Sequence, residues 1–120
     1  MLSEYFYISL ETMRKNGNVV ATPVWFAEDA GKLFVWTQAD SGKIKRIRNN
    51  TRVRVAPCDQ RGGLKGGWIP ATARVIDDPA SIERVSAMLR KRFGLAKRLF
   101  ELMGKLRRNK YAAIELTLGE

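Results

Sequence analysis

Apolar and polar positions alternate in short runs through the first third of the chain, which is the pattern of β-strands with one buried face. Three segments carry this alternation, residues 5–11, 19–28 and 33–38. Turn sequences rich in Asn, Asp and Gly separate them at residues 15–18 and 29–32. Because such short turns cannot form a parallel crossover, we expect the three strands to form an antiparallel meander.

The spacing of apolar residues changes after residue 40 and later returns to that of strands. Ile44 and Ile47 indicate a short helix that ends near residue 49, with Asp40 or Ser41 as its N-cap. Further along the chain, two segments again show the alternation of strands, and a glycine-rich, basic loop separates them. The two strands expected there are residues 52–57 and 68–76.

The C-terminal third is predominantly helical. Asp78 followed by Pro79 is typical of a helix start, with the aspartate as N-cap and the proline at the first helical position. Apolar residues then recur at helical spacing as far as a break at Gly94, and again beyond it in a second helix. These positions are Ile82, Val85, Leu89 and Phe93 in the first helix and Leu95, Leu99, Leu102, Met103 and Leu106 in the second.

A closing strand at residues 111–118 brings the expected total to six strands and three helices. A chain of 120 residues has room for one domain, so we assign residues 1–120 to a single unit. The order of the elements predicts a mainly β fold. We expect a six-stranded antiparallel β-barrel with a short helix after the third strand and two helices in its C-terminal half.

Charge and composition narrow the chemistry that such a barrel performs. Lysine and arginine number 22 against 12 acidic residues, a net charge of +10, so we expect an anionic partner. The chain contains no histidine, which excludes Ser-His-Asp and Cys-His catalysis and metal sites that need histidine. The single cysteine, Cys58, suits a reducing compartment. We expect a cytoplasmic protein without a transmembrane segment, since residues 1–11 lack a signal-peptide pattern and no apolar run is long enough to span a bilayer.

The start of the helix after residue 40 offers chemistry that suits an anion. Free backbone N–H groups and the positive end of the helix dipole coincide there. Ser41 offers a hydroxyl donor, and Gly42 allows close approach to the backbone. Lys43 supplies a full charge, and Arg46, three residues on, reaches the same side. A phosphate fits this arrangement; the alternative is a capped surface helix with solvated charges.

Several segments around this helix resemble the split-barrel flavin-binding superfamily of pyridoxamine 5'-phosphate oxidase. They are Trp36-Thr37, Ser41-Gly42-Lys43, Asn49-Asn50 and Arg52-Val53, with Thr51 where that superfamily usually has proline. A closer resemblance is to the branch that uses the deazaflavin coenzyme F420 in place of FMN. It is carried by residues 7–10, 14–17, 20–26, 55–62 and 71–75, which occur in the order of that family.

The resemblance implies a split barrel that binds F420, or alternatively FMN, and acts as an oxidoreductase. Such an enzyme transfers a hydride to or from a small organic substrate, and the cofactor supplies the reactive centre. The resemblance puts Ser41 and Lys43 on the cofactor phosphate, with Gly42 and Arg46 beside them. It assigns no catalytic residue and no metal ligand.

The same resemblance implies roles for the neighbouring strands. Trp36 and Thr37 would lie against the phosphate and the ribityl chain. Members of the family form homodimers with two sites at the interface, so residues 60–68 would approach from the partner subunit or cover the ring. Four consecutive residues would run beside the ring and offer backbone groups to its polar edge: Ala21, Thr22, Pro23 and Val24.

Two alternatives from other functional classes remain open. A basic β-barrel that binds single-stranded nucleic acid would use Trp25, Trp36 or Trp68 for base stacking. That interpretation accounts for the charge but not for the ordered motifs, so we do not expect nucleic acid as the partner. A flavin-binding protein that stores or senses the cofactor without turnover would share the phosphate site.

The two C-terminal helices raise a separate question. Residues 84–110 carry ten basic residues and one acidic residue, Glu101. We expect the leucines of these helices to pack on the barrel and the basic face to be solvated. The alternative is that the charge attracts the anionic tail of a cofactor or substrate. A nucleic-acid or anionic-membrane surface has no dedicated motif in this segment.

Overall fold

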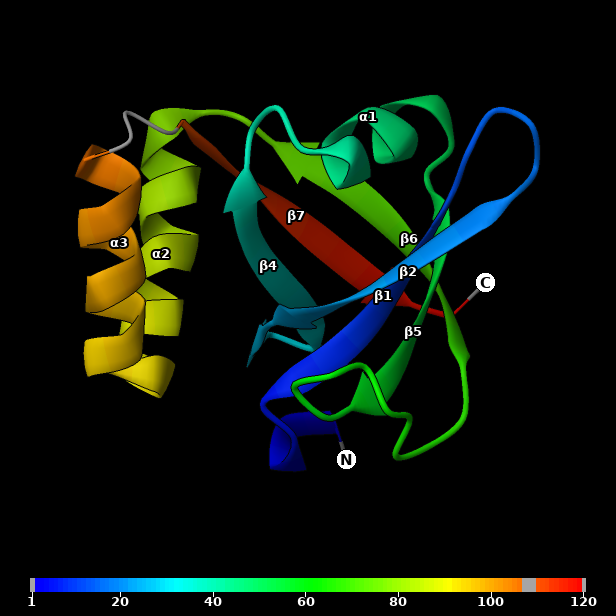
Figure 1. Cartoon of the computed structure of the whole chain (residues 1–120), viewed down its shortest axis with the longest axis horizontal. Coiled ribbons are helices and arrows are strands. Elements are labelled where there is room, and N and C mark those ends of the chain that lie inside the picture. Colours follow the sequence, from blue (N-terminus) through cyan, green and yellow to red (C-terminus); the bar gives the residue numbers. More distant parts are fainter. Residues whose placement is uncertain (1, 107–109, 120) are drawn as a thin grey trace.

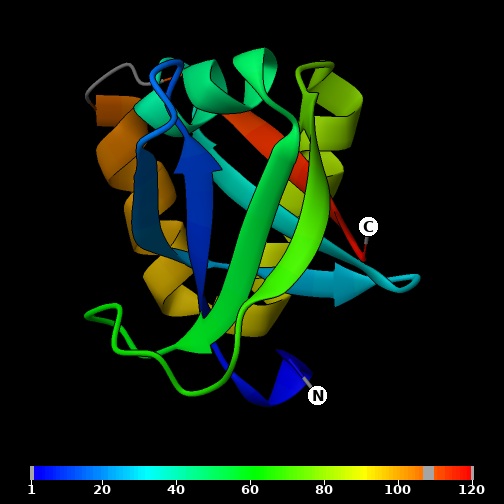
Figure 2. The same ribbon diagram turned by 90° about the vertical axis from the view of Figure 1, so that its right-hand side faces the viewer.

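Seven strands of the computed structural model form one antiparallel sheet, which curls into a half-barrel (Figure 1). The structure describes residues 2–106 and 110–119. A short helix, α1 (Gly42–Asn49), closes one end of the half-barrel. Two longer helices, α2 (Pro79–Phe93) and α3 (Leu95–Leu106), lie side by side along its outer surface (Figure 2). The strands are β1 (Tyr7–Met13), β2 (Val19–Trp25), β3 (Ala27–Asp29), β4 (Lys32–Gln38), β5 (Arg52–Cys58), β6 (Ile69–Ile76) and β7 (Tyr111–Leu118), and a short 3-10 helix at Leu2–Glu4 precedes β1.

The sheet closes on itself at Phe26. This residue alone separates β2 from β3, yet the two strands lie at opposite ends of the strand order β2-β1-β5-β6-β7-β4-β3. The sheet must therefore curl until its two edges approach each other at Phe26, whose side chain is fully buried. The single strand expected at residues 19–28 is thus two strands, and the sheet has seven strands rather than six.

The antiparallel pairings of the expected meander are confirmed, β1 with β2 and β3 with β4, but its middle strand is split in two for the same reason. β2 pairs with β1, whereas β4 pairs with β3 and β7. The bend at Phe26 carries the chain from one edge of the sheet to the other, so β2 and β4 are not hydrogen-bonded neighbours. β2 is consequently an edge strand, and one row of its backbone N–H and C=O groups faces away from the ladder.

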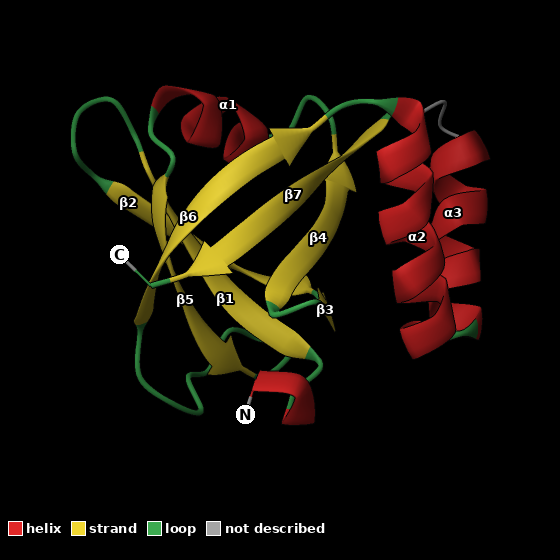
Figure 3. Ribbon diagram, turned by 180° about the vertical axis from the view of Figure 1, so that it is seen from behind, coloured by secondary structure: helices red, strands yellow, loops and turns green. Residues whose placement is uncertain are grey.

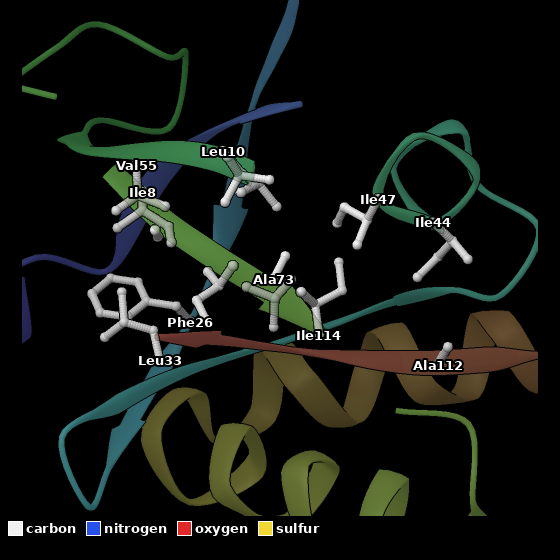
Figure 4. Packing of buried hydrophobic residues seen from close by; sticks show 14 residues of the cluster. Ile8, Leu10, Phe26, Leu33, Ile44, Ile47, Val55, Ala73, Ala112 and Ile114 are labelled. Carbon is white, nitrogen blue, oxygen red and sulfur yellow. The ribbon is translucent and has the colours of Figure 1, made fainter. Parts of the chain in front are cut away.

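The interior of the half-barrel is filled by apolar side chains that alternate along the strands (Figure 4). Ile44 and Ile47 of α1 project into this interior and close its end, as their spacing predicts. Each fully buried aliphatic side chain contributes about 1.5–3 kcal/mol through the hydrophobic effect. The strand residues labelled in the core are Ile8, Leu10, Leu33, Val55, Ala73, Ala112 and Ile114, with Phe26 beside them.

α2 covers the outer face of β4 and β7 (Figure 3). Val85 and Leu89 are buried against that face, in agreement with the helical spacing. The predicted start is also confirmed, because the Asp78 carboxylate accepts the N–H of Ser81 at 2.9 Å and Pro79 begins the helix.

α3 has the orientation opposite to the expected one. Leu95, Leu99 and Leu102 are 84%, 58% and 55% exposed, whereas the side chain of Lys97 is fully buried. The expectation that these leucines pack on the barrel is therefore wrong for this helix.

Within the described part of the chain, no helix has the length and apolarity needed to cross a membrane.

Candidate functional site

The start of α1 is built where β4 ends. Ser41 is the N-cap, one of the two residues that the sequence indicates, and its Oγ accepts the N–H of Ile44 at 3.5 Å. The Ser41 N–H donates to the carbonyl of Gln38 at 3.1 Å, which ties the helix to the last residue of the strand. The cap uses an acceptor lone pair of the hydroxyl, so the Ser41 O–H hydrogen is not consumed by it. Backbone N–H groups of the first turn face outward from this point.

Three cations gather around this helix start. Burial lowers the pKa of Lys43, and the charge of Arg46 lowers it further. Burial likewise lowers the pKa of Arg46, with a second contribution from the charge of Arg14. Arg46 therefore makes Lys43 harder to protonate and Arg14 does the same to Arg46, and a bound anion would relieve the repulsion. The cluster is suited to a ligand with at least one negative charge.

Arg46 is held in place by the sheet. Its Nε–H donates to Thr12 Oγ1 at 2.6 Å, across 34 residues of sequence, and Thr12 is buried. Arg46 also lies against the backbone of Gly42, where an added Cβ would come within 2.6 Å of Nη1. Glycine at this position thus leaves room for the guanidinium group beside the helix start.

An open cavity of about 440 Å³ lies between α1 and the turn that joins β1 to β2. Its lining combines Gly42 with four cationic side chains and two asparagines. Lys43 is not among the described residues that line it, but its charge interacts with that of Arg46, which does. The cationic side chains are Arg14, Lys15, Lys45 and Arg46.

The structure adds Arg14 and Thr12 to the residues that the sequence indicates. Both come from the end of β1 and the turn after it, and they meet α1 only in the folded chain. No local spacing connects positions 12 and 14 with position 46. The four residues predicted for the phosphate, Ser41, Gly42, Lys43 and Arg46, do lie together on the first turns of α1.

The β2 residues predicted to run beside a ring face two ways. Ala21 and Pro23 are exposed, whereas Thr22 and Val24 are turned inward and partly buried. Thr22 Oγ1 is buried without a hydrogen-bond partner in the described structure. The side chains of Thr22 and Val24 thus lie on the core side, and contact of this segment with a ligand would come from the edge-strand backbone and from Ala21 and Pro23.

Trp36 and Thr37 also face opposite sides of β4. The Trp36 ring stacks on Tyr111 at 3.9 Å, and the Lys97 ammonium lies 3.5 Å from the centre of the same ring. Two groups this close must occupy opposite faces, so the indole has no free face for a ligand ring. Thr37 points the other way, beside Ala112 of β7, and is partly buried.

The loop of residues 59–68 lies against its own barrel. Asp59 accepts the N–H groups of Arg61 and Gly63 at 2.9 and 2.8 Å, and Gly62 lies beside Pro23 of β2. The loop therefore borders the exposed edge of β2. That it approaches the ring from the partner subunit or covers the ring stays a prediction.

Comparison with solved structures shows the same fold in proteins of different kinds. The heme storage protein HutZ of Vibrio cholerae is 16% identical, with a TM-score of 0.74 over 99% of this chain and 85% of that chain. An F420 reductase is 16% identical, with a TM-score of 0.61 over 96% of this chain and 87% of that chain. General stress protein 26 of Bacillus anthracis is 19% identical, with a TM-score of 0.61 over 98% and 82% of the two chains. At these identities the similarity shows the split-barrel fold alone.

The comparison at the level of sequence is more specific. Among curated proteins none matches the chain. The sequence model of a family described as pyridoxamine 5'-phosphate oxidase, by contrast, matches residues 2–119, which is nearly the whole chain. The protein is therefore a member of the pyridoxamine 5'-phosphate oxidase family.

Proposed function

We propose that the protein binds F420, or alternatively FMN, with the cofactor phosphate at the start of α1. The observation that carries this proposal is the cluster of Lys43, Arg46 and Arg14, in which burial and mutual repulsion lower the pKa values of Lys43 and Arg46. Keeping like charges together costs free energy that a bound phosphate recovers. The cluster adjoins a capped helix start with outward-facing N–H groups, a preferred position for phosphate.

The chain's own residues would hold and orient the cofactor. Ser41 donates its hydroxyl hydrogen to a phosphate oxygen, and Lys43 and Arg46 neutralise the charge. Thr12 fixes the direction of the Arg46 guanidinium, so little side-chain entropy is lost on binding. The backbone groups on the free edge of β2 hydrogen-bond the polar edge of the ring.

The bound deazaflavin or flavin would accept or donate a hydride, and we propose that the protein is an oxidoreductase acting on a small organic molecule. A site of this kind needs orientation and exclusion of water more than an acid or base from the protein. This agrees with a chain that contains no histidine. We also propose a homodimer, as the resemblance implies, with the second subunit completing the wall around the ring.

Heme is a second candidate ligand, because the structural neighbour HutZ is named as a heme storage protein. Globins and peroxidases hold the heme iron by a proximal histidine, and this chain has none. Its single cysteine, Cys58, is buried, and burial raises the pKa of its thiol, which disfavours a thiolate ligand. These observations favour a flavin-type cofactor over heme.

Base stacking by tryptophan receives little support from the ring contacts. Both faces of Trp36 are covered, and Trp25 stacks on Phe93 at 4.4 Å. The guanidinium of Arg54 lies 4.8 Å above the Trp68 ring. Trp36 thus offers no free face for a base, and Trp25 and Trp68 each already have a partner over one face, which favours the cofactor proposal.

Side-by-side titration with FMN and F420 tests the proposal. We expect one of the two to bind at micromolar concentrations, seen as quenching of cofactor fluorescence. Failure of both cofactors to bind would overturn the proposed function. Binding that falls steeply with salt for unrelated single-stranded DNA sequences, with no cofactor bound, would favour the nucleic-acid alternative instead.

A charge deletion locates the phosphate. Lys43→Ala removes one charge-assisted contact, so we expect cofactor binding to weaken by about 1–3 kcal/mol, or roughly 5- to 150-fold in Kd. Lys91→Ala is the matched control, because Lys91 is exposed on α2 and its deletion changes net charge equally. Equal affinities of the Lys43→Ala variant and the wild type would place the phosphate elsewhere.

A further inference from the structure

The polarity of α3 is inverted relative to that of a helix packed on a core. Leu95, Leu99 and Leu102 are exposed, and Met103 beside them is 40% exposed. We call these four residues the outward face of α3. On the opposite side of the helix, Lys97 is fully buried. A stripe of four neighbouring exposed apolar residues on one helix is a candidate surface for interaction.

The buried side of α3 explains why the helix cannot simply turn over. Lys97 Nζ donates to Ser86 Oγ at 2.9 Å and to Glu101 Oε1 at 2.8 Å. Arg90 Nη2 donates to the same carboxylate at 2.6 Å. Rotating α3 to bury its leucines would break this network and leave its charged groups without their hydrogen-bond partners. The polar network therefore holds the outward face toward the surroundings, where it is available for docking.

The charges around the outward face indicate which kind of surface can bind to it. Arg98 lies next to Leu95 and Leu102 on the helix surface, Lys105 lies next to Leu102, and both cations are exposed. Glu101 is the one acidic residue of α3, and it is turned inward toward Arg90 and Lys97. A symmetric contact between two copies of α3 would thus bring cations against cations without acids to offset them. A surface that is both apolar and negatively charged complements this face.

We propose that α3 docks in the plane of an anionic lipid bilayer, with the outward face inserted among the acyl chains. Its twelve residues make a helix about 18 Å long, which suits a helix lying in the interface. Arg98 and Lys105 at the rim reach the lipid phosphates. Arg98 and Lys105, part of the basic charge that is expected from the sequence to be solvated, acquire a role in this arrangement. The proposal is independent of cofactor binding.

Vesicle co-sedimentation tests the docking. The probe is phosphatidylcholine vesicles with and without phosphatidylserine. We expect the wild type to bind the vesicles with phosphatidylserine and to be released by salt. The double variant Leu99→Gln/Leu102→Gln should bind about tenfold more weakly or worse, because two inserted leucines are lost. Arg98→Gln should weaken binding about fivefold, the effect of one juxtamembrane cation.

Leu64→Gln is the matched control, since Leu64 is 49% exposed in the loop of residues 59–68, away from α3. It should bind as the wild type does. Circular dichroism checks that each variant is folded, which is expected because the substituted side chains are exposed. No binding to either vesicle, or equal binding with and without phosphatidylserine, would overturn the proposal. So would a wild-type dimer that the double variant dissociates while vesicle binding stays unchanged, because the occupant would then be a second copy.

Discussion

The buried charge cluster beneath α3 makes a sharp prediction about stability and pH. Glu101 accepts hydrogen bonds from Arg90 and Ser86 as well as from Lys97, and these contacts lower its pKa from 4.5 to about 2. A shift of this size corresponds to about 3 kcal/mol of stability at neutral pH. The carboxylate is 26% exposed, and burial lowers the pKa of Lys97 despite its contact with Glu101, so solvent and desolvation reduce the net value to about 2 kcal/mol.

The variant Glu101→Gln isolates this contribution because it keeps the shape of the side chain and removes its charge. A carboxyl group with a depressed pKa in the folded state stabilises the protein above its unfolded pKa and loses this effect as pH falls toward its folded pKa. Urea unfolding should therefore show the wild type more stable than the variant by about 2 kcal/mol at neutral pH. The difference should shrink as pH falls through the interval from 4.5 to about 2.

Glu83→Gln is the control for this experiment. Glu83 also pairs with Arg90, at 3.6 Å, but its side chain is 68% exposed, so we expect little change in stability. If the wild type and Glu101→Gln keep the same difference in unfolding free energy at every pH, the charge of Glu101 does not stabilise the cluster and the reasoning fails.

Two further substitutions test the packing of the fold. A methyl group at Gly104 would overlap the Tyr111 hydroxyl, so Gly104→Ala should destabilise the protein by about 1–3 kcal/mol in urea unfolding. Gly67→Ala adds a methyl group to open space and should leave the stability unchanged. Equal effects of the two substitutions would argue against close packing of α3 on the Trp36–Tyr111 stack. Phe26→Ala should cost about 3–5 kcal/mol, because this fully buried ring fills the point where the sheet closes, and a loss below about 1 kcal/mol would contradict that role.

Local signals in the sequence were sufficient to predict where helices α1 and α2 begin and which residues of α1 face the core. Ser41 starts α1, Asp78 and Pro79 start α2, and Ile44 and Ile47 face the core as their spacing predicts. These features depend on neighbours within one or two helical turns. The residues predicted to bind phosphate are grouped together for the same reason, since they share the first turns of a helix.

Features that depend on distant contacts were not predictable in this way. The segment around Phe26 has a continuous β-rich pattern, and only closure of the sheet makes it bend there. Periodicity located the apolar stripe of α3 but not its direction, which is determined by partners of Lys97 such as Ser86 on another helix. Arg14 lies in a segment that carries the family resemblance, but only tertiary packing brings it into the phosphate cluster, so no local spacing indicates that role.

Binding of a phosphate at the start of α1 is tested by comparing two ligands that differ in that phosphate. FMN and riboflavin differ only in the phosphate, so their affinities for the wild type and for Lys43→Ala/Arg46→Ala measure what the cluster contributes. If F420 proves to be the tighter ligand, the same comparison is made with its phosphate-free deazaflavin. We expect the wild type to bind the phosphorylated form about tenfold more tightly or better, and the double variant to lose most of this preference. Equal affinity of the wild type for the two forms would contradict phosphate binding at the start of α1.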